Sequence, residues 1–322
     1  MRGFGVLALA ICGWAAGADR TFEVAGQVLP EAQASVSLFG ATSPFTTATL
    51  TDSRGKFRFT RLAAGQYTVA AFIPGYGEKR LTIDLGPSST GADGRFVLTL
   101  RLDEGTGAET LGGKVSVTQL AVPEKARKRY LEAQKRLEKR DTDGAVEQLK
   151  KAVDAAPRFT EAWNNLGTIA YQTKRYSDAE HYFRTALAVE PGAFEPLVNL
   201  GGVLLTLDKA DEAYQYNLYA VLKRPRAALA NSQMGMNCFA LGKMDLAEKY
   251  LLEAQRLDPG HFSHPQLLLA EIYLRRHEYG KTADELEDFL RYHPDWPTAT
   301  KIRETVAKLR ASAEAGVQAA QH

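Results

Sequence analysis

Residues Phe159–Pro191 read FTEAWNNLGTIAYQTKRYSDAEHYFRTALAVEP, and this stretch decides the fold of the C-terminal part of the chain. Apolar residues recur at helical spacing on both sides of a short break at Thr173–Arg175, which predicts two helices joined by a tight turn. Small residues, Gly167 in the first helix and Ala179 and Ala186 in the second, let the two backbones approach closely. One such pair cannot bury its own apolar face, so the stretch implies similar neighbours.

The neighbours are visible as a repeat of 34 residues. The small residue of the first helix returns at this spacing as Ala133, Gly167, Gly201 and Gly235. The alanines of the second helix and the proline that ends it return in the same register: Ala145, Ala179, Ala213 and Ala247, then Ala152, Ala186, Ala220 and Ala254, then Pro157, Pro191, Pro225 and Pro259. A fifth copy follows one residue late, with Ala270, Thr282, Phe289 and Pro294, so its packing must differ.

This period, with W-x2-LG early in the unit, alanines and an aromatic residue later, and a closing proline, resembles the tetratricopeptide repeat. The resemblance implies a curved helical solenoid of about five repeats over residues 126–296. A further helical pattern with Ile302, Val306 and Leu309 predicts a capping helix at residues 297–313, followed by a tail at 314–322.

The preceding part of the chain, residues 19–118, has a period of two instead. Short alternating stretches separated by glycine turns predict a small β-sandwich, joined to the repeats by a linker at 119–125. The expected strands are Phe22–Val28, Ala34–Phe39, Thr46–Leu50, Lys56–Thr60, Tyr67–Phe72, Leu81–Leu85, Arg95–Leu102 and Lys114–Leu120. The predicted fold class is therefore an all-β sandwich domain followed by an all-α helical solenoid.

A D-x-x-G turn and an F-x-F strand lie within Thr51–Phe59, and a G-x-Y strand start and a P-G-Y turn follow, ending at Tyr76. Together they resemble the carboxypeptidase regulatory-like domain, a prealbumin-type β-sandwich. The resemblance implies an exported spacer or interaction module without catalysis. Asp52, Asp84 and Asp93 lack the dense spacing of a calcium loop, so we expect turn formation and no metal site.

The N-terminus has the pattern of an export signal. Arg2 precedes an apolar run from Phe4 to Ala16, and Ala16-Gly17-Ala18 fits a signal peptidase site, so we expect a signal peptide at residues 1–18 with cleavage near Ala18. The bulky Ile11 disfavours lipoprotein processing at Cys12. The mature chain is then expected outside the cytoplasm, periplasmic or extracellular, without a transmembrane span and with Cys238 as its one thiol, buried as a small apolar residue.

The composition is that of a folded protein, with a formal net charge of +2 that gives no global attraction to nucleic acid. The stretch Lys125–Arg140 is basic, but Glu132 and Glu138 interrupt it. We interpret it as the solvated outer face of the first repeat, with contact to acidic lipid or glycan as the alternative and no nucleic-acid partner expected.

Stacked helical pairs curve, and their first helices line the concave wall. The register places a candidate partner-binding set on that wall: Tyr130, Gln134, Asn164, Asn165, Thr168, Tyr171, Asn199, Gln233, Met236, Phe239 and Arg275. Leu205 is expected on the same wall, outside this set. Amides at Asn165, Asn199 and Gln233 can pair with the backbone of any extended peptide, or they can pack at the seams between repeats. The two-carboxylate clamp of arrays that bind chaperone tails needs lysines beside these amides. Here the neighbouring residues are Asn164, Val198 and Ser232, so we do not expect that class of ligand.

Sequence patterns of catalysis are lacking. There is no G-x-S-x-G, HExxH, phosphate-binding glycine loop or CxxC motif. His261 and His264 fall on a loop, and His181, His277 and His293 are expected at helix ends on the surface. We therefore expect no catalytic residues, no metal and no cofactor.

These patterns predict an exported, non-enzymatic scaffold or adaptor that binds a partner protein or an extended peptide in the concave groove. The alternative is a cell-envelope carbohydrate-binding protein, in which loops of the sandwich near Tyr76 contact glycan and the repeats serve assembly.

Overall fold

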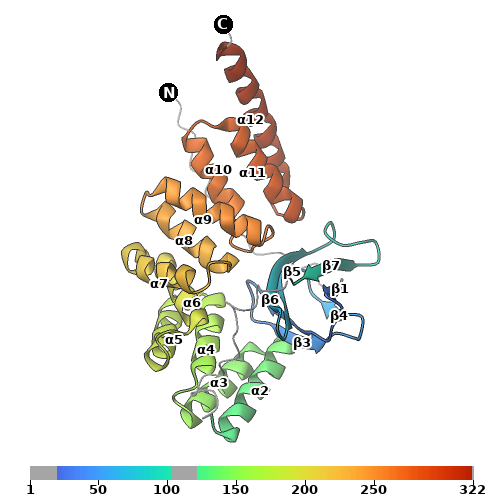
Figure 1. The fold of residues 1–322 in the computed structure, drawn as a ribbon, viewed down its shortest axis with the longest axis vertical. Coiled ribbons are helices and arrows are strands. Elements are labelled where there is room, and N and C mark those ends of the chain that lie inside the picture. The colour runs from blue at the N-terminus through green and yellow to red at the C-terminus, as the bar shows by residue number, and fades with distance from the viewer. Residues whose placement is uncertain (1–19, 103–121, 321–322) are drawn as a thin grey trace.

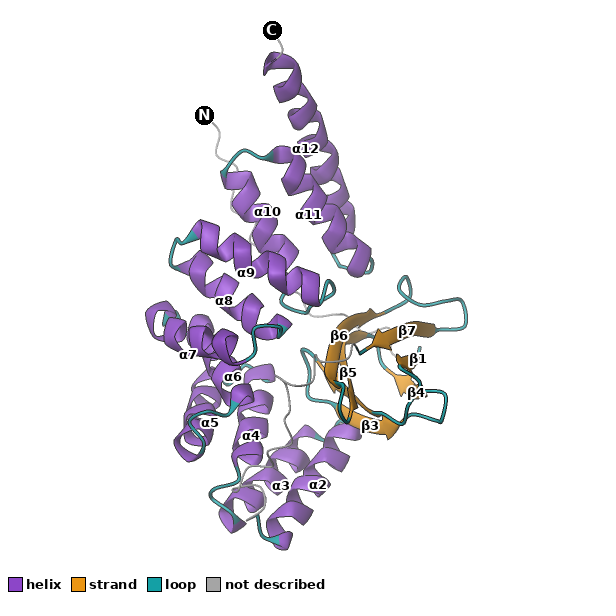
Figure 2. Ribbon diagram, in the orientation of Figure 1, coloured by secondary structure: helices purple, strands orange, loops and turns teal. Residues whose placement is uncertain are grey.

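The computed structural model describes residues 20–102 and 122–320. The expected signal segment, Cys12 and the expected strand at Lys114–Leu120 lie outside the described residues. Figure 2 shows the strands gathered in one body and the helices in a second, curved body. The predicted fold class, a β-sandwich followed by a helical array, is confirmed.

The sandwich consists of two sheets. Its strands are β1 (Phe22–Leu29), β2 (Ser35–Gly40), β3 (Thr46–Leu50), β4 (Lys56–Leu62), β5 (Gly65–Ile73), β6 (Gly77–Leu85) and β7 (Arg95–Arg101). One sheet has the order β4-β1-β7 and the other β3-β2-β5-β6. The β1–β7 pair is parallel and the other pairs are antiparallel. β6 starts earlier than expected, because the tight turn after Ile73 joins it to β5 as a hairpin.

The turn chemistry predicted for Asp52 is confirmed. Its carboxylate accepts hydrogen bonds from the backbone amides of Arg54 (2.9 Å) and Lys56 (2.8 Å), and Gly55 has the positive φ of 72° that the turn requires. Asp93 accepts from the Arg95 amide in the same way (3.1 Å). Both carboxylates thus stabilise turns. The turn expected at Asp84 is wrong, because Asp84 lies within β6 and is buried.

The helices within the described ranges form five antiparallel pairs and a final helix. They are α2 (Glu124–Glu138), α3 (Thr142–Ala155), α4 (Thr160–Gln172), α5 (Tyr176–Val189), α6 (Phe194–Thr206), α7 (Ala210–Lys223), α8 (Ala228–Ala240), α9 (Met244–Leu257), α10 (Pro265–Arg275), α11 (Tyr279–Tyr292) and α12 (Ala299–Ala320). α12 continues beyond residue 313, where the expected capping helix ends. None of the helices that the structure describes is long and apolar enough to cross a membrane.

Close helix approach explains the small residue of each repeat. A Cβ atom on Gly167 would lie 2.5 Å from the ring of Phe183, and one on Gly235 would lie 2.7 Å from Leu251. Cys238 is fully buried, as predicted, and burial raises the pKa of its thiol.

The third repeat departs from this apolar packing. Asn217 occupies the position of Phe183 and Leu251, and it is fully buried against Gly201. Its Nδ2 donates to Oδ1 of Asn237 (3.2 Å), so a polar pair replaces an apolar contact at the centre of the array. The repeat alignment shows an asparagine at this position, but it does not predict that Asn217 is buried.

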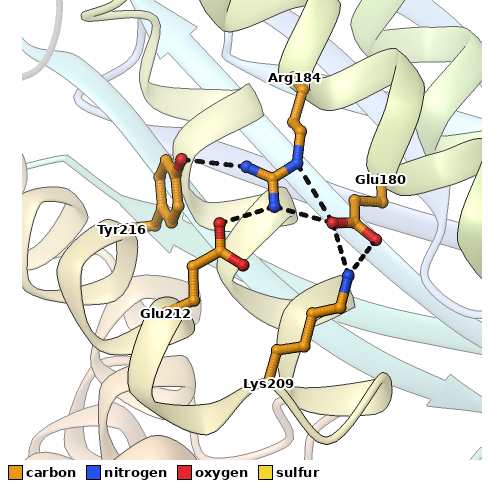
Figure 3. A network of polar contacts seen from close by, with 5 residues as sticks. All are labelled: Glu180, Arg184, Lys209, Glu212 and Tyr216. Atoms are coloured by element: carbon orange, nitrogen blue, oxygen red, sulfur yellow. Dashed lines mark hydrogen bonds and ion pairs between the residues drawn. The ribbon is translucent and has the colours of Figure 1, made fainter.

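A polar network joins the second helices of repeats two and three (Figure 3). Arg184 donates to Glu180 and Glu212 (2.7 Å each) and to the hydroxyl of Tyr216 (3.3 Å), while Lys209 donates to Glu180 (2.9 Å). Partial burial opposes ionisation of Glu180, but the bonds from Lys209 and Arg184 outweigh it and lower the pKa of its carboxyl. The network connects α5 with the start of α7.

Candidate functional site

The first helices of repeats two and three lie on the side of the array that faces the sandwich. In Figure 1, α4 and α6 are on this inner side, and α5 and α7 are on the outer side. The candidate groove residues come from α2, α4, α6, α8 and α10, the first helices of the five described pairs.

At the N-terminal end of the groove, the polar side chains pair across the repeats. Asn165 donates from Nδ2 to the hydroxyl of Tyr130 (3.0 Å), and Asn199 donates from Nδ2 to Oδ1 of Asn164 (3.1 Å). Thr168 donates to the backbone carbonyl of Asn164 (3.0 Å). The two amide NH2 groups therefore form hydrogen bonds across the interfaces between neighbouring repeats. A peptide-binding role for these residues stays a prediction.

Further along the array, an apolar row crosses successive first helices at one register position. Tyr171, Leu205 and Phe239 are 34 residues apart in sequence, and the exposed fraction of Tyr171 is 38%. The guanidinium of Arg275 lies 4.9 Å from the ring centroid of Phe239, which extends the row with a cation–π contact. We define the groove row as Tyr171, Leu205, Phe239 and Arg275.

Three other predicted groove residues do not join this row through any described contact. Gln134 and Met236 are half-buried in α2 and α8. Gln233 is also half-buried, and its side-chain amide packs against Gly202 in α6. Its Oε1 is buried without a hydrogen-bond partner among the described atoms. Gln233 thus serves packing between α6 and α8 in this structure.

The sandwich contacts the array through buried polar groups that the sequence analysis missed. The backbone amide of Thr82 donates to both carboxylate oxygens of Asp258 (3.0 Å each), and its hydroxyl donates to the same carboxylate (2.7 Å). Nδ1 of His293 lies 3.1 Å from Oδ2 of Asp84. Thr82 and Asp84 lie on the outer face of β6, yet both are buried, because the array covers that face. We call these four residues the polar seam.

The prediction that His293 lies on the surface is wrong. Its side chain is fully buried, since the sandwich covers the loop that follows α11. Its Nε2 lies 3.3 Å from Nδ1 of His264. Burial, together with the proximity of His293 and His261, lowers the pKa of His264 to about 3, so the His264 ring is neutral at physiological pH. The covering strand is distant in sequence, so helix position alone could not reveal this burial.

A second set of contacts holds the sandwich to the first two repeats. Arg140 donates to the hydroxyl of Tyr67 (2.9 Å) and lies 5.0 Å from the ring centroid of Phe45. Gln172, at the end of α4, donates to the backbone carbonyl of Gly40 (3.0 Å). The sandwich therefore touches the array near both of its ends.

Over residues 20–102 and 122–320, no group of three or more His, Cys, Asp or Glu side chains could hold a metal ion. His264 and His293 lie beside the polar seam. His293 contacts Asp84, and the ring of His264 packs against Phe289 and Trp296.

One carboxyl in the array has a strongly displaced pKa. Burial, reinforced by Asp288 and Asp284, raises the pKa of Glu285 from 4.5 to about 7, although a hydrogen bond from Gln255 opposes the shift. The folded state therefore holds this proton where the unfolded chain has lost it, so the free energy of unfolding falls as pH rises from 4.5 to 7.

We expect Glu285→Gln to remove this dependence. The variant should be more stable than the parent by about 1–3 kcal/mol at pH 8 and nearly equal at pH 4. Urea unfolding followed by circular dichroism at both pH values measures the difference, with Glu314→Gln on the exposed face of α12 as control. Equal stabilities of parent and Glu285→Gln at pH 8 would contradict the raised pKa.

Comparison with known proteins confirms both domain resemblances. Residues 23–100 match the model of the carboxypeptidase regulatory-like domain. Residues 130–187, 175–228 and 228–261 match models of the tetratricopeptide repeat. The matched ranges cover the sandwich and the first four helical pairs, and the fifth pair is seen in the structure.

Two similar proteins each match about half of this chain. Anaphase-promoting complex subunit 6 of Arabidopsis thaliana is 26% identical over 168 residues, which are 49% of this chain and 30% of that protein. A BBSome complex member BBS4 homolog of Drosophila melanogaster is 24% identical over 154 residues, 47% of this chain and 32% of that protein. The chain thus spans about a third of the length of these relatives.

Among solved structures, the type IV pilus biogenesis factor PilW superposes with a TM-score of 0.53 at 20% identity, covering 61% of this chain and 90% of PilW. At this identity the likeness shows the fold alone.

Proposed function

From a chain built of a carboxypeptidase regulatory-like domain followed by tetratricopeptide repeats, we propose an exported, non-enzymatic scaffold that binds an extended segment of a partner protein along the groove row. The repeats support a protein-interaction role, since stacked helical pairs form extended concave binding surfaces. The row itself is the observation that carries the proposal.

The row suits an extended, partly apolar peptide. Neighbouring first helices are about 10 Å apart, which corresponds to about three residues of extended chain. Tyr171, Leu205 and Phe239 then offer one apolar contact per repeat. Arg275 (53% exposed side chain) donates from Nε to Glu271 (2.8 Å) and offers the rest of its guanidinium at the end of the row. We therefore propose a segment with spaced apolar side chains and an acidic group near one end.

A random 12-residue peptide display on the full chain tests this proposal. Selected peptides should lose about 10-fold or more in affinity for Tyr171→Ala with Arg275→Ala, because aromatic and arginine side chains dominate such contacts. The matched control is Tyr219→Ala with Arg256→Ala, which changes the same residue types on second helices at similar exposure (44% and 61%). Equal losses in both double variants would contradict the groove assignment.

Export rests on the segment Met1–Ala18, which is outside the described residues. We expect the mature protein in the periplasmic or extracellular fraction with Asp19 as its first residue. Cell fractionation followed by N-terminal sequencing measures both. A full-length chain that stays in the cytoplasm would refute the export part and leave the scaffold part intact.

A further inference from the structure

The helix α2 begins the array with one face uncovered. In the following repeats, the first helix packs against the second helix of the repeat before it, α4 against α3 and α6 against α5. No helix among the described residues precedes α2, which lies at one end of the array in Figure 1. Six α2 positions on this face correspond, 34 residues later, to apolar residues of α4 that are buried or half-buried: Phe159, Ala162, Trp163, Leu166, Ile169 and Ala170.

The same positions of α2 carry charged residues. We define the cationic end face as these six residues and the one that follows them on the same side of the helix: Lys125, Lys128, Arg129, Glu132, Lys135, Arg136 and Lys139. The face has six cations and one carboxylate, whereas the whole chain has a formal net charge of only +2. A terminal repeat needs a polar outer face for solubility, but that need does not select one sign of charge. The excess of cations therefore requires another reason.

Most cations of this face have no counter-charge. Lys128 pairs with Glu124 (2.9 Å) and Arg136 pairs with Asp141 (2.6 Å). The other four cations make no ion pair with any carboxylate in the described ranges: Lys125, Arg129, Lys135 and Lys139. They form two pairs that are four residues apart on the helix, where like charges repel each other. An external anion would relieve this repulsion.

A cavity of about 470 Å³ lies on the face. Its lining residues are Lys125, Lys128, Arg129, Glu132 and Arg136 of α2 and Gln148 of α3. Gln148 is 5% exposed, and its Oε1 accepts a hydrogen bond from Nη1 of Arg129 (3.1 Å). Trp163 and Tyr182 stack on each other at the corresponding positions of the second repeat. A polar pair thus replaces an aromatic one, and it orients the Arg129 guanidinium while leaving its other N–H groups for an anion.

The sandwich leaves this face open. Its described hydrogen bonds to this part of the array involve Glu138, which accepts from Thr47 (2.8 Å), and Arg140, which donates to Tyr67 (2.9 Å). Neither Glu138 nor Arg140 belongs to the cationic end face. Five of the six cations are exposed in the structure and Arg136 is half-buried. A partner can therefore reach the face without separating the two domains.

We propose that the cationic end face is a docking surface for anionic phospholipid. Lipid phosphates accept charge-assisted hydrogen bonds from arginine and lysine, and clustered basic residues are attracted to an anionic membrane surface. The face contains no aromatic residue on which a base could stack, which favours lipid over single-stranded nucleic acid. Leu131 is 50% exposed and one turn away from Lys128 and Lys135, so it adds an apolar side chain beside the cations. This inference goes beyond the proposed function, since it uses none of the groove-row residues.

Vesicle sedimentation tests the proposal. The chain from Asp19 onward contains every described residue and lacks the apolar run Phe4–Ala16, which could itself insert into lipid. It should sediment with vesicles of phosphatidylcholine and phosphatidylglycerol in equal parts and not with vesicles of phosphatidylcholine alone. Added salt should weaken the binding, because it screens exposed charges.

Two quadruple variants with the same net charge locate the binding surface. The first removes the four unpaired cations: Lys125→Gln, Arg129→Gln, Lys135→Gln and Lys139→Gln. It should bind the anionic vesicles about 100-fold more weakly or worse, because each basic residue near an anionic surface contributes about fivefold. The control removes three lysines and one arginine that are exposed on α9 and α12: Lys249→Gln, Lys301→Gln, Arg303→Gln and Lys308→Gln. It should bind like the parent, and circular dichroism checks that both variants are folded.

The outcomes decide the proposal. Equal losses in the two quadruple variants overturn the assignment to this face. Equal binding of both kinds of vesicle overturns the requirement for anionic lipid. Binding of fluorescein-labelled polyglutamate without binding of vesicles would show that the partner is an acidic protein segment and would overturn the lipid assignment. Peptide binding along the groove row is measured separately, so failure of this proposal leaves the proposed function standing.

Discussion

Phe183→Ala is expected to lower the stability of the array by about 3–5 kcal/mol. The Phe183 side chain is 1% exposed and packs directly on Gly167 and among the apolar residues of repeats two and three. Truncation loses the transfer free energy of the ring and leaves a cavity, because Gly167 has no side chain to fill the space. Chemical unfolding followed by the helical circular dichroism signal measures the loss.

The control is Tyr219→Ala, also on a second helix but 44% exposed. Surface substitutions of this kind change stability by about 0.5 kcal/mol or less. The argument from helix packing fails if both alanine variants have the same unfolding midpoint. A loss confined to Phe183→Ala supports the account of why glycine recurs in the first helices.

Asp258→Ala is expected to release the sandwich and to lower the free energy of unfolding by about 2–3 kcal/mol. The Asp258 carboxylate is 2% exposed and satisfies both the amide and the hydroxyl of Thr82. Its removal leaves two buried donors without an acceptor, and hydrogen bonds to a charged group are the more costly ones to lose. Unfolding followed separately in the sandwich and the array should change from one coupled transition to two.

Two further variants qualify this result. Asp258→Asn keeps an acceptor oxygen and should have an intermediate effect. Asp245→Ala changes the same residue type at the start of α9, where the side chain is 99% exposed, and should cost about 0.5 kcal/mol or less. Asp258→Ala with a single transition and parental stability would show that the seam does not couple the domains.

Local spacing was sufficient to predict most of the fold. The break at Thr173–Arg175 falls between α4 and α5, and the turn at Asp52 and Gly55 has the predicted bonds. These features depend on residues close together in sequence, whose side chains set helix ends and turns directly. The period of 34 then extends one hairpin to the whole array.

Local sequence spacing could not predict the contacts of the polar seam. Thr82 and Asp258 are 176 residues apart, and Asp84 and His293 are 209 apart. A polar residue on the outer face of a strand is ordinarily solvated, so Thr82 and Asp84 carried no signal of burial. For the groove, the register predicted which helices carry the candidate side chains. It left open whether Asn165 and Asn199 pair with a peptide or pack between repeats, where they bond to Tyr130 and Asn164.

Site-specific photo-crosslinking tests most directly whether the partner lies on the concave side. Benzoylphenylalanine replaces Tyr171 in one protein and Tyr219 in another, two tyrosines of similar exposure (38% and 44%) on a first and a second helix. The full chain, expressed in cells and irradiated, should form a discrete crosslinked species with a partner protein from position 171 and not from 219. Crosslinking from position 219 alone would contradict the concave-side account.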